Sequence, residues 1–264
     1  MKIALLDSGI GLLAAAAALR ELRPDADLVL TSDPDGMPWG PRTAADVTAH
    51  ALDCARAAVG HRPDALVVAC NTASVHALEA IRAELEPGIP VIGTVPAVKP
   101  AAAGGGPVAI WATPATTGSA YQRGLIRDFA GGAEVVEVPC WGMAEAVEQA
   151  DEQTVAESVA AAVARTPVGI RALVLGCTHY ELVADRIRTA LGQVAQERAQ
   201  GLELYGSARA VAVQALRRVA PEAVARQGRG TLTVLRSGRV EELPPAALGY
   251  REGRLLDTAA LARP

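Results

Sequence analysis

The feature that most constrains this chain is a regular alternation of short apolar runs with longer segments of helical periodicity. The first part of the chain contains three such pairs. We expect strands at 2–6, 27–31 and 64–69, and helices at 11–22, 43–59 and 73–85. This order is typical of parallel sheets covered by helices on both faces, because each parallel crossover needs a long connection. The sequence therefore predicts an α/β fold.

The alternation restarts after a connector rich in alanine and glycine at 99–107. The second series predicts strands at 108–112, 133–138 and 171–176, and helices at 114–130, 143–149 and 152–165.

The last part of the chain predicts a helix at 208–219 and a strand at 231–236, which we expect to return to the first half. The tail after Arg239 shows turn signals and little else. We therefore expect a first α/β domain of 1–97 plus 206–264 and a second α/β domain of 98–205.

The composition limits the partners and the compartment. The net charge of −4 comes without long runs of either sign, which argues against nucleic acid or an anionic membrane as the main partner. No apolar stretch reaches the roughly 20 residues of a membrane helix, and Asp7 interrupts any signal-peptide core. We expect a cytoplasmic protein. The four cysteines include no Cys-x-x-Cys pair, so neither a disulfide framework nor a metal site is expected.

Two cysteines occupy nearly matching positions in the two halves. Cys70 follows the apolar run 65–69 and Cys177 follows the apolar run 172–176, and small polar residues and a helical pattern come after each. A thiol at a helix N-terminus favours its ionised form. An isolated cysteine is usually an ordinary core residue. The duplicated setting instead favours two thiols that act on one substrate.

The other two cysteines serve as a comparison. Cys54 lies on the apolar face of the helix expected at 43–59, so we assign it to the core. Cys140 follows an expected strand and is a candidate for lining the site, although a core position is favoured.

Every polar motif of the chain falls where an expected strand ends, which is where parallel α/β sheets bind their ligands. These motifs are 7–9, 33–40, 70–72, 113–116 and 177–179.

Two of these polar side chains are candidates for proton transfer. Asp7 either accepts a proton beside a thiol or caps the first helix. His179 comes two residues after Cys177, close enough for proton exchange. Glu148, by default, is a solvated helix residue, and His50, His61 and His76 have no comparable context.

Two cofactor classes fit the sequence poorly. The run 7–11 has a superficial likeness to a dinucleotide fingerprint, but it lacks the third glycine and places Asp7 beside the pyrophosphate. Pyridoxal phosphate needs a Schiff-base lysine. The only lysines are Lys2 and Lys99, and neither lies in a site motif. A cofactor-free reaction is favoured.

With these motifs the chain resembles the aspartate/glutamate racemase superfamily, and glutamate racemases most closely, over about residues 1–220. The cysteine boxes 70–74 and 176–180 together carry the resemblance. Weaker matches are the opening motif 7–11, the loop with Asp33, Pro38 and Gly40, the threonine loop from Thr113 to Tyr121, and Glu148.

The resemblance implies two pseudo-symmetric, flavodoxin-like, doubly wound domains with the active site in the cleft between them. It also implies racemisation without a cofactor, in which one cysteine removes the Cα proton of an acidic amino acid and the other returns a proton to the opposite face. Asp7 would assist Cys70, and His179 with Glu148 would assist Cys177. The residues that would hold the substrate are Ser8, Pro38, Trp39, Gly40, Asn71, Thr72, Thr113, Thr116 and Thr178.

The family further suggests a homodimer whose D-glutamate product enters cell-wall peptidoglycan. The chain departs from the family pattern at Leu12, at Trp39 and over 141–145, which are near the opening motif or the expected pocket wall. Two alternatives therefore stay open. One is a racemase or isomerase for aspartate or another small acid, and the other is a non-catalytic ligand-binding relative. A pure binder has no need for both thiols.

Overall fold

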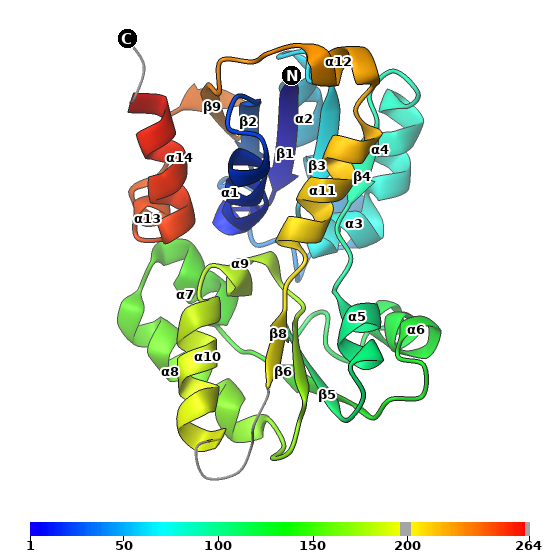
Figure 1. Ribbon diagram of the computed structural model, residues 1–264, viewed down its shortest axis with the longest axis vertical. Coiled ribbons are helices and arrows are strands. Elements are labelled where there is room, and N and C mark those ends of the chain that lie inside the picture. Colours follow the sequence, from blue (N-terminus) through cyan, green and yellow to red (C-terminus); the bar gives the residue numbers. More distant parts are fainter. Residues whose placement is uncertain (196–201, 262–264) are drawn as a thin grey trace. The chain divides into compact units, whose positions relative to one another are not determined.

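Two parallel-dominated sheets, each within a compact unit of its own, organise the chain (Figure 1). The computed structural model describes residues 1–195 and 202–261, and gives 193–195 and 258–261 by backbone alone. The first unit comprises Met1–Val95 and Ala208–Pro264, and the second comprises Pro96–Ser207. Of the two expected domains, positions 196–201 and 262–264 lie outside the described residues. The predicted α/β class is confirmed.

The first unit is built on six strands. They are β1 (Lys2–Asp7), β2 (Asp27–Ser32), β3 (Ala65–Val68), β4 (Val91–Gly93), β9 (Leu232–Arg236) and β10 (Arg239–Glu241). Its helices begin with a 3₁₀ turn and include two short segments from the returning chain. They are η1 (Ile10–Leu12), α1 (Leu13–Leu22), α2 (Ala44–Val59), α3 (Asn71–His76), α4 (Leu78–Leu85), α11 (Ala208–Arg218), α12 (Pro221–Ala225), α13 (Pro245–Leu248) and α14 (Arg251–Leu261).

The strand order in this sheet is β10-β9-β2-β1-β3-β4, and every pair is parallel except β10 with β9. In the register, Leu6 of β1 lies between Thr31 of β2 and Val68 of β3. The carboxyl ends of these strands therefore meet at one edge, and the loops that follow them are neighbours.

Helices cover both faces of the first sheet. On one face α1 packs against α11 and α14, and on the other α2 packs against α3 and α4 (Figure 1). Leu6, Val68 and Val47 are fully buried in the core under α2. Small side chains such as Ala51 and Ala55 on α2 let this helix approach the sheet closely.

The second unit has four strands and six helices among the described residues. The strands are β5 (Val108–Ala112), β6 (Val135–Pro139), β7 (Ala172–Leu175) and β8 (Glu203–Tyr205). The helices are α5 (Val98–Ala103), α6 (Ala120–Phe129), α7 (Met143–Gln149), α8 (Glu152–Arg165), α9 (Thr178–Glu181) and α10 (Ala184–Ala195).

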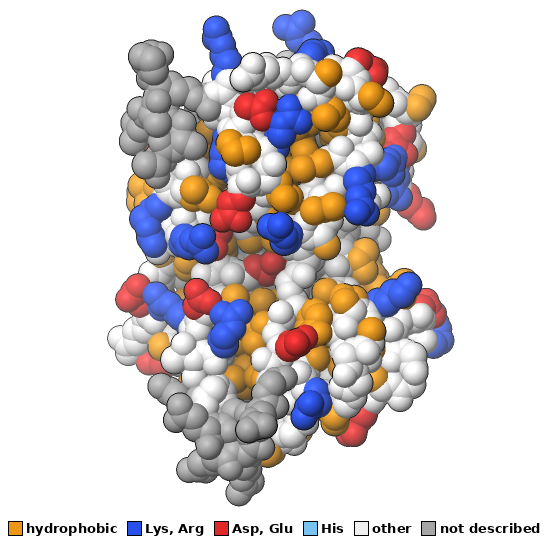
Figure 2. Space-filling view, in the orientation of Figure 1, with side chains coloured by type: hydrophobic (Ala, Val, Ile, Leu, Met, Phe, Trp, Pro, Cys, Tyr) orange, Lys and Arg blue, Asp and Glu red, His pale blue; other side chains and the backbone are white. Residues whose placement is uncertain are grey.

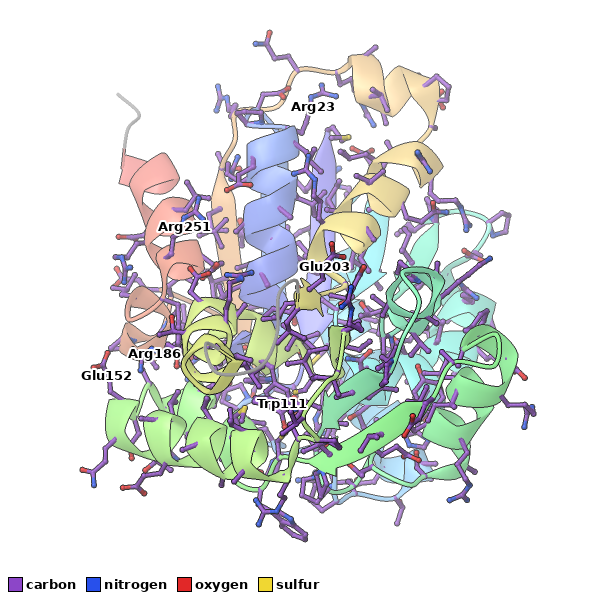
Figure 3. All side chains as sticks on the ribbon, turned by 60° about the horizontal axis from the view of Figure 1, so that its bottom comes forward. Arg23, Trp111, Glu152, Arg186, Glu203 and Arg251 are labelled. Atoms are coloured by element: carbon purple, nitrogen blue, oxygen red, sulfur yellow. The ribbon has the colours of Figure 1, made fainter. Side chains whose placement is uncertain are left out.

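The second sheet is fully parallel, in the order β6-β5-β7-β8. This order repeats the order β2-β1-β3-β4 of the first unit, so the two units are related in topology as well as in sequence. Helices α5 and α6 pack together on the unit's apolar core, and α8 packs against α7 and α10. Arg186 of α10 pairs with Glu152 of α8 at 2.8 Å, and Trp111 is buried on β5 (Figure 3).

Four sequence expectations need correction. The connector 99–107 is partly helical, because α5 occupies Val98–Ala103. The helix expected at 73–85 is two helices that meet at Ala77, whose φ of −116° departs from helical geometry.

The helix expected at 114–130 begins only at Ala120, because Gly118 has a φ of +69° and the Ser119 hydroxyl accepts from the Gln122 amide as the N-cap. The tail after Arg239 carries β10, α13 and α14. The turn signal there is a hairpin, since Ser237 and Gly238 both have positive φ between β9 and β10.

The charged side chains on one face of the molecule do not gather by sign (Figure 2). The face seen in Figure 2 shows acidic and basic side chains interspersed among apolar ones. Within 1–195 and 202–261 no helix is long and apolar enough to cross a membrane. The same ranges contain no group of three or more His, Cys, Asp or Glu side chains arranged to hold a metal ion.

Candidate active site

In the first unit, neighbouring strands bring Asp7 and Cys70 to the same edge of the sheet. Asp7 is the last residue of β1, and Cys70 follows β3 as the N-cap of α3. The amide of Ala69 donates to the Leu6 carbonyl at 2.8 Å, which ties the two strand ends together. This is the point where the strand order reverses, the usual ligand position in such sheets.

The surroundings of the Cys70 thiol favour its protonated form, not the ionised form expected at a helix N-terminus. Burial raises its pKa well above the ordinary value, and the Asp7 carboxylate raises it further through its charge and a hydrogen bond. The backbone amides of Ala73 and Ser8 act in the opposite direction, because they donate toward the sulfur. The Cys70 thiol therefore has a carboxylate directly beside it.

The side chain of Asp7 lies beside the Cys70 thiol. Its side chain is fully buried, and its Oδ1 accepts from the Ser8 amide at 2.7 Å. The following 3₁₀ turn has Gly9 at its N-cap position, with no side-chain capping bond. Both roles considered for Asp7, a proton acceptor and a helix cap, therefore stay predictions.

The substrate-binding candidates of the first unit lie on three neighbouring loops. Ser8 is buried next to Asp7, and Asn71 and Thr72 are the first two residues of α3. Pro38 is exposed on the loop after β2.

The neighbours of Pro38 on this loop differ from it in exposure. Gly40 is partly exposed, whereas the side chain of Trp39 points into the core and is only 1% exposed. Its indole Nε1 donates to Asp33 Oδ2 at 3.1 Å.

The second unit repeats the cysteine turn. Cys177 follows β7 as the N-cap of α9, with φ and ψ of −135° and 137°, against −126° and 125° for Cys70. The Gly176 amide donates to the Trp111 carbonyl at 2.7 Å, as Ala69 does to Leu6 in the first unit. A Cβ on Gly176 would lie 2.8 Å from that carbonyl oxygen, so glycine is required here by the close approach of β5.

Cys177, His179 and Glu148 form a chain of contacts that leads away from the thiol. The Cys177 sulfur lies 3.8 Å from His179 Nδ1, and His179 Nε2 lies 2.9 Å from Glu148 Oε2. The side chains of His179 and Glu148 are 6% and 20% exposed, so Glu148 is not the solvated helix residue that its default interpretation predicts. A carboxylate on one imidazole nitrogen orients the ring and stabilises its protonated form.

Three threonines complete the second unit's candidates. Thr113 and Thr116 follow β5, and their hydroxyls are 3.2 Å apart. Thr178 is the buried first residue of α9. All three lie at the same sheet edge as Cys177, because β5 and β7 are paired in parallel.

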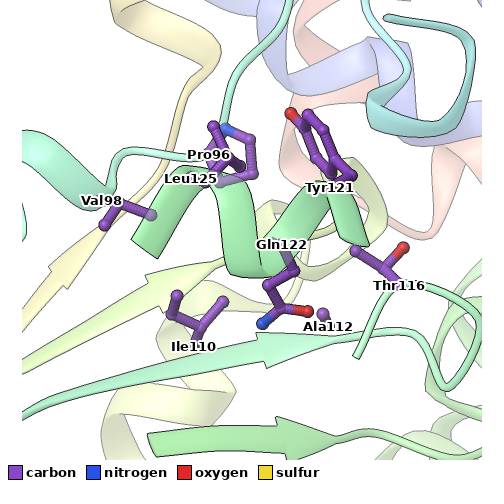
Figure 4. A pocket seen from close by; sticks show the side chains of 9 residues that line it. Pro96, Val98, Ile110, Ala112, Thr116, Tyr121, Gln122 and Leu125 are labelled. Atoms are coloured by element: carbon purple, nitrogen blue, oxygen red, sulfur yellow. The ribbon is translucent and has the colours of Figure 1, made fainter. Parts of the chain in front are cut away.

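A small cavity lies behind this edge, lined by residues that include Thr116, Gly176 and Gln122 (Figure 4). Its volume of about 10 Å³ is comparable to one water molecule. Gln122 projects from α6 toward it and is 2% exposed, and neither polar atom of its side-chain amide has a partner among the described residues. No motif in the sequence marks Gln122 as a site residue.

The comparison cysteines lie in the core. Cys54 is 4% exposed and Cys140 is 2% exposed, and burial is the main reason that the pKa of each rises to about 12. The Cys140 thiol donates to the Val138 carbonyl at 3.6 Å. Both are inert thiols under ordinary conditions.

His50, for which the sequence suggests no role, contacts a buried acidic side chain in the fold. His50 Nδ1 lies 2.8 Å from Asp33 Oδ2, at the start of the loop that carries Pro38 and Gly40. The helical spacing of Asp46 and His50 is visible in the sequence, but nothing there connects α2 to Asp33.

Known proteins resemble this chain in both sequence and structure. The Asp/Glu/hydantoin racemase family model matches residues 12–220. A glutamate racemase of Roseiflexus sp. (strain RS-1) is 36% identical over 195 residues, which cover 72% of this chain and 71% of that protein.

Solved glutamate racemases share the fold. The Escherichia coli enzyme, in complex with L-glutamate and the activator UDP-MurNAc-Ala, superposes with a TM-score of 0.76 at 26% identity, covering 94% of this chain and 91% of that one. The Thermus thermophilus enzyme, in complex with β-chloro-D-alanine, gives a TM-score of 0.67 at 29% identity, with 99% and 93% coverage.

Proposed function

Because this chain belongs to the Asp/Glu/hydantoin racemase family, we propose that it is a glutamate racemase that inverts the α carbon without a cofactor. Similar curated proteins are glutamate racemases, and the similar Escherichia coli structure holds L-glutamate. The substrate class is accordingly a small acidic amino acid.

The observation that carries this proposal is the pair of matching thiol turns, each with its own proton acceptor. Cys70 has Asp7, and Cys177 has His179 backed by Glu148. An ordinary buried cysteine needs no such partner. Cys54, which packs in the apolar core of the first unit, is an example of such a cysteine.

The proton transfers balance as follows. In one direction Cys177, after passing its proton to His179, takes the Cα proton, while the Cys70 thiol gives its proton to the opposite face. In the other direction Cys70, relieved of its proton by Asp7, is the base and the Cys177 thiol is the acid. Inversion requires one sulfur on each face of the substrate. General acid–base catalysis of this kind contributes about 10²–10⁴-fold.

The rest of the rate enhancement has to come from stabilising the negative charge that develops on the substrate. Backbone amides at the starts of α3 and α9 and the hydroxyls of Ser8, Thr113 and Thr116 are the donors we assign to this task. We assign Pro38, Gly40, Asn71, Thr72 and Thr178 to substrate binding as well, and Trp39 only indirectly, through its bond to Asp33.

The lysines support a cofactor-free route. Lys2 lies at the amino end of β1, opposite the edge that carries Asp7, and its ammonium donates to the His61 carbonyl at 2.9 Å. Lys99 is on α5, outside the thiol turns. Neither lysine belongs to a thiol turn, so we assign neither to a Schiff base.

The test is exchange and inversion in D₂O with single enantiomers of glutamate and of aspartate, followed by NMR for loss of the Cα proton and by optical rotation. We expect both signals with glutamate and no requirement for added pyridoxal phosphate or metal. Absence of exchange with any acidic amino acid would refute the proposal and favour a ligand-binding relative. Inversion of aspartate alone would correct the substrate.

Single variants then test the two-thiol assignment. Cys70→Ser and Cys177→Ser should each abolish inversion with an unchanged circular dichroism spectrum, whereas Cys54→Ala, a buried cysteine in the core, should stay active. Full activity in either serine variant contradicts the assignment.

On the same family grounds we propose a cytoplasmic homodimer whose D-glutamate serves cell-wall peptidoglycan. Light scattering of the purified protein tests the dimer, and D-glutamate auxotrophy of a deletion strain tests the role. A monomer that retains full activity would refute the first.

A further inference from the structure

The buried carboxylate of Asp33 collects donors from distant parts of the first unit. Its Oδ2 meets His50 Nδ1 at 2.8 Å and Trp39 Nε1 at 3.1 Å. Its Oδ1 accepts from the Gly36 amide at 3.1 Å and from the Ser237 hydroxyl at 3.2 Å. These donors come from α2, from the loop itself and from the β9–β10 hairpin, so one side chain fastens three segments.

The same residue fixes the backbone of the loop after β2. The Asp33 carbonyl accepts from the amides of Gly36 and Met37 at 3.1 and 2.9 Å, and its own amide donates to the Ser8 carbonyl at 3.1 Å. This last hydrogen bond joins the start of the loop to the residue that follows Asp7. Gly36 has no room for a Cβ, which would lie 2.0 Å from Asp33 Oδ2.

His50 is the donor best suited to hold this carboxylate. It is 30% exposed and lies between Asp33 and Asp46, whose Oδ1 is 3.6 Å from its Nε2. An ionised carboxylate only accepts hydrogen bonds, so the short contact places a hydrogen on Nδ1. Hydrogen bonds to an ionised group are roughly twice as strong as neutral ones.

We propose that His50 is a positioning residue for substrate binding, which acts through Asp33 to hold the Pro38–Gly40 segment in its binding conformation. His50 contacts Asp33 and Asp46, and we assign it an action through Asp33 rather than on the reacting atoms. Trp39 and Ser237 hold the same carboxylate from the loop and from the hairpin. This inference rests on the racemase function proposed above, since it assigns that segment to the substrate.

The expected effect is on KM rather than on kcat. When a binding segment spends only a tenth of its time in the competent conformation, the apparent affinity falls tenfold. His50→Leu removes the donor and keeps bulk, so we expect KM for L-glutamate to rise about tenfold with kcat within about twofold. His50→Asn keeps an N–H donor near the position of Nδ1 and should restore KM to within about threefold.

The matched control is His61→Leu, which removes a histidine from the turn that follows α2 and should leave KM and kcat unchanged. Ser237→Ala removes a different donor to the same carboxylate, so a rise of about threefold in KM is expected there even if His50→Leu fails to fold.

A spectroscopic measurement tests directly whether Trp39 keeps its hydrogen bond to Asp33. The chain has three tryptophans, so the indole N–H region of a ¹⁵N spectrum holds three signals, and Trp39→Phe assigns one of them. In His50→Leu we expect the Trp39 signal to shift, while those of Trp111 and Trp141 stay in place. A general loss of structure would move all three.

The outcomes separate the two proposals. A wild-type protein that racemises no acidic amino acid overturns the function and this inference with it. An active wild type together with an unchanged KM in folded His50→Leu and Ser237→Ala overturns this inference alone, as does an unshifted Trp39 signal in His50→Leu.

Discussion

Replacing Gly176 by alanine tests the closeness of β5 to the second thiol turn. The new Cβ would lie 2.8 Å from the Trp111 carbonyl oxygen and 3.2 Å from the Cβ of Ala112, and both neighbours belong to a buried strand. Overpacking of this kind costs about 1–3 kcal/mol, and the lower entropy of the unfolded alanine chain offsets about 0.4–1 kcal/mol. We expect a net loss of about 1.5 kcal/mol.

Two measurements test the effect of Gly176→Ala, one on stability and one on activity. By the usual relation for chains of this size, thermal unfolding should show Tm lower by about 3–6 °C. Relief of the contact moves Gly176 and therefore Cys177 by a few tenths of an ångström, so kcat should fall about tenfold.

The matched control is the same substitution at Gly192, inside α10, where a Cβ meets nothing within 4 Å. There alanine removes the helix penalty of glycine, so stability should rise by about 0.8–1 kcal/mol and kcat should not change. If Gly176→Ala is as stable and as active as the wild type, the close approach of β5 does not constrain the turn and the reasoning is refuted.

Three further predictions concern single side chains. Glu148→Gln keeps the shape but removes the charge that His179 faces, so kcat should fall about 10–100-fold with little change in KM, and an unchanged kcat would contradict the proton relay. Cys54 and Cys140 have raised pKa values, so each contributes stability that is fully present below its unfolded pKa of about 8.5 and is lost as pH rises toward about 12. Urea unfolding between pH 8 and 10 should therefore show stability falling by about 1 kcal/mol per pH unit for each such thiol, with a slope that steepens toward pH 10, and Cys54→Ala should reduce that slope. Gln122→Met replaces a buried amide that lacks a protein partner, so stability should rise by about 1 kcal/mol, and a lower Tm would mean that the amide is satisfied.

Much of the fold was predictable because it depends on local periodicity. The strands β1, β2, β3, β5 and β7 fall within two residues of their expected positions, since each is a short apolar run that is buried on both faces. The short strands β4 and β8 were not predicted, because three residues carry too little pattern. The tail was missed for a different reason, because its helices gain their stability by packing on α1 and on each other.

In the candidate site, too, some features were predictable from the sequence and others depend on tertiary packing. The positions of Cys70 and Cys177 at strand ends followed from the sequence, and so did the proximity of His179, which is two residues from its thiol. Glu148 lies 31 positions from His179, and only the packing of α7 beside α9 brings them to 2.9 Å.

The interior position of Trp39 also depends on tertiary structure. Its sequence neighbours Pro38 and Gly40 suggest a loop surface, but the buried Asp33 carboxylate offers its indole N–H a partner inside the core.

The sequence by itself determined the alternation of strands and helices, the duplication of the thiol turn and the scarcity of lysine. Each of these is a property of neighbouring residues or of composition. Only the tertiary structure decided which partners reach the buried polar groups. The parallel register of β2 with β9 brings Ser237 to Asp33, and the packing of α2 on β2 brings His50 there. Buried charge must find hydrogen-bond donors wherever the fold supplies them, and no local pattern records where those are.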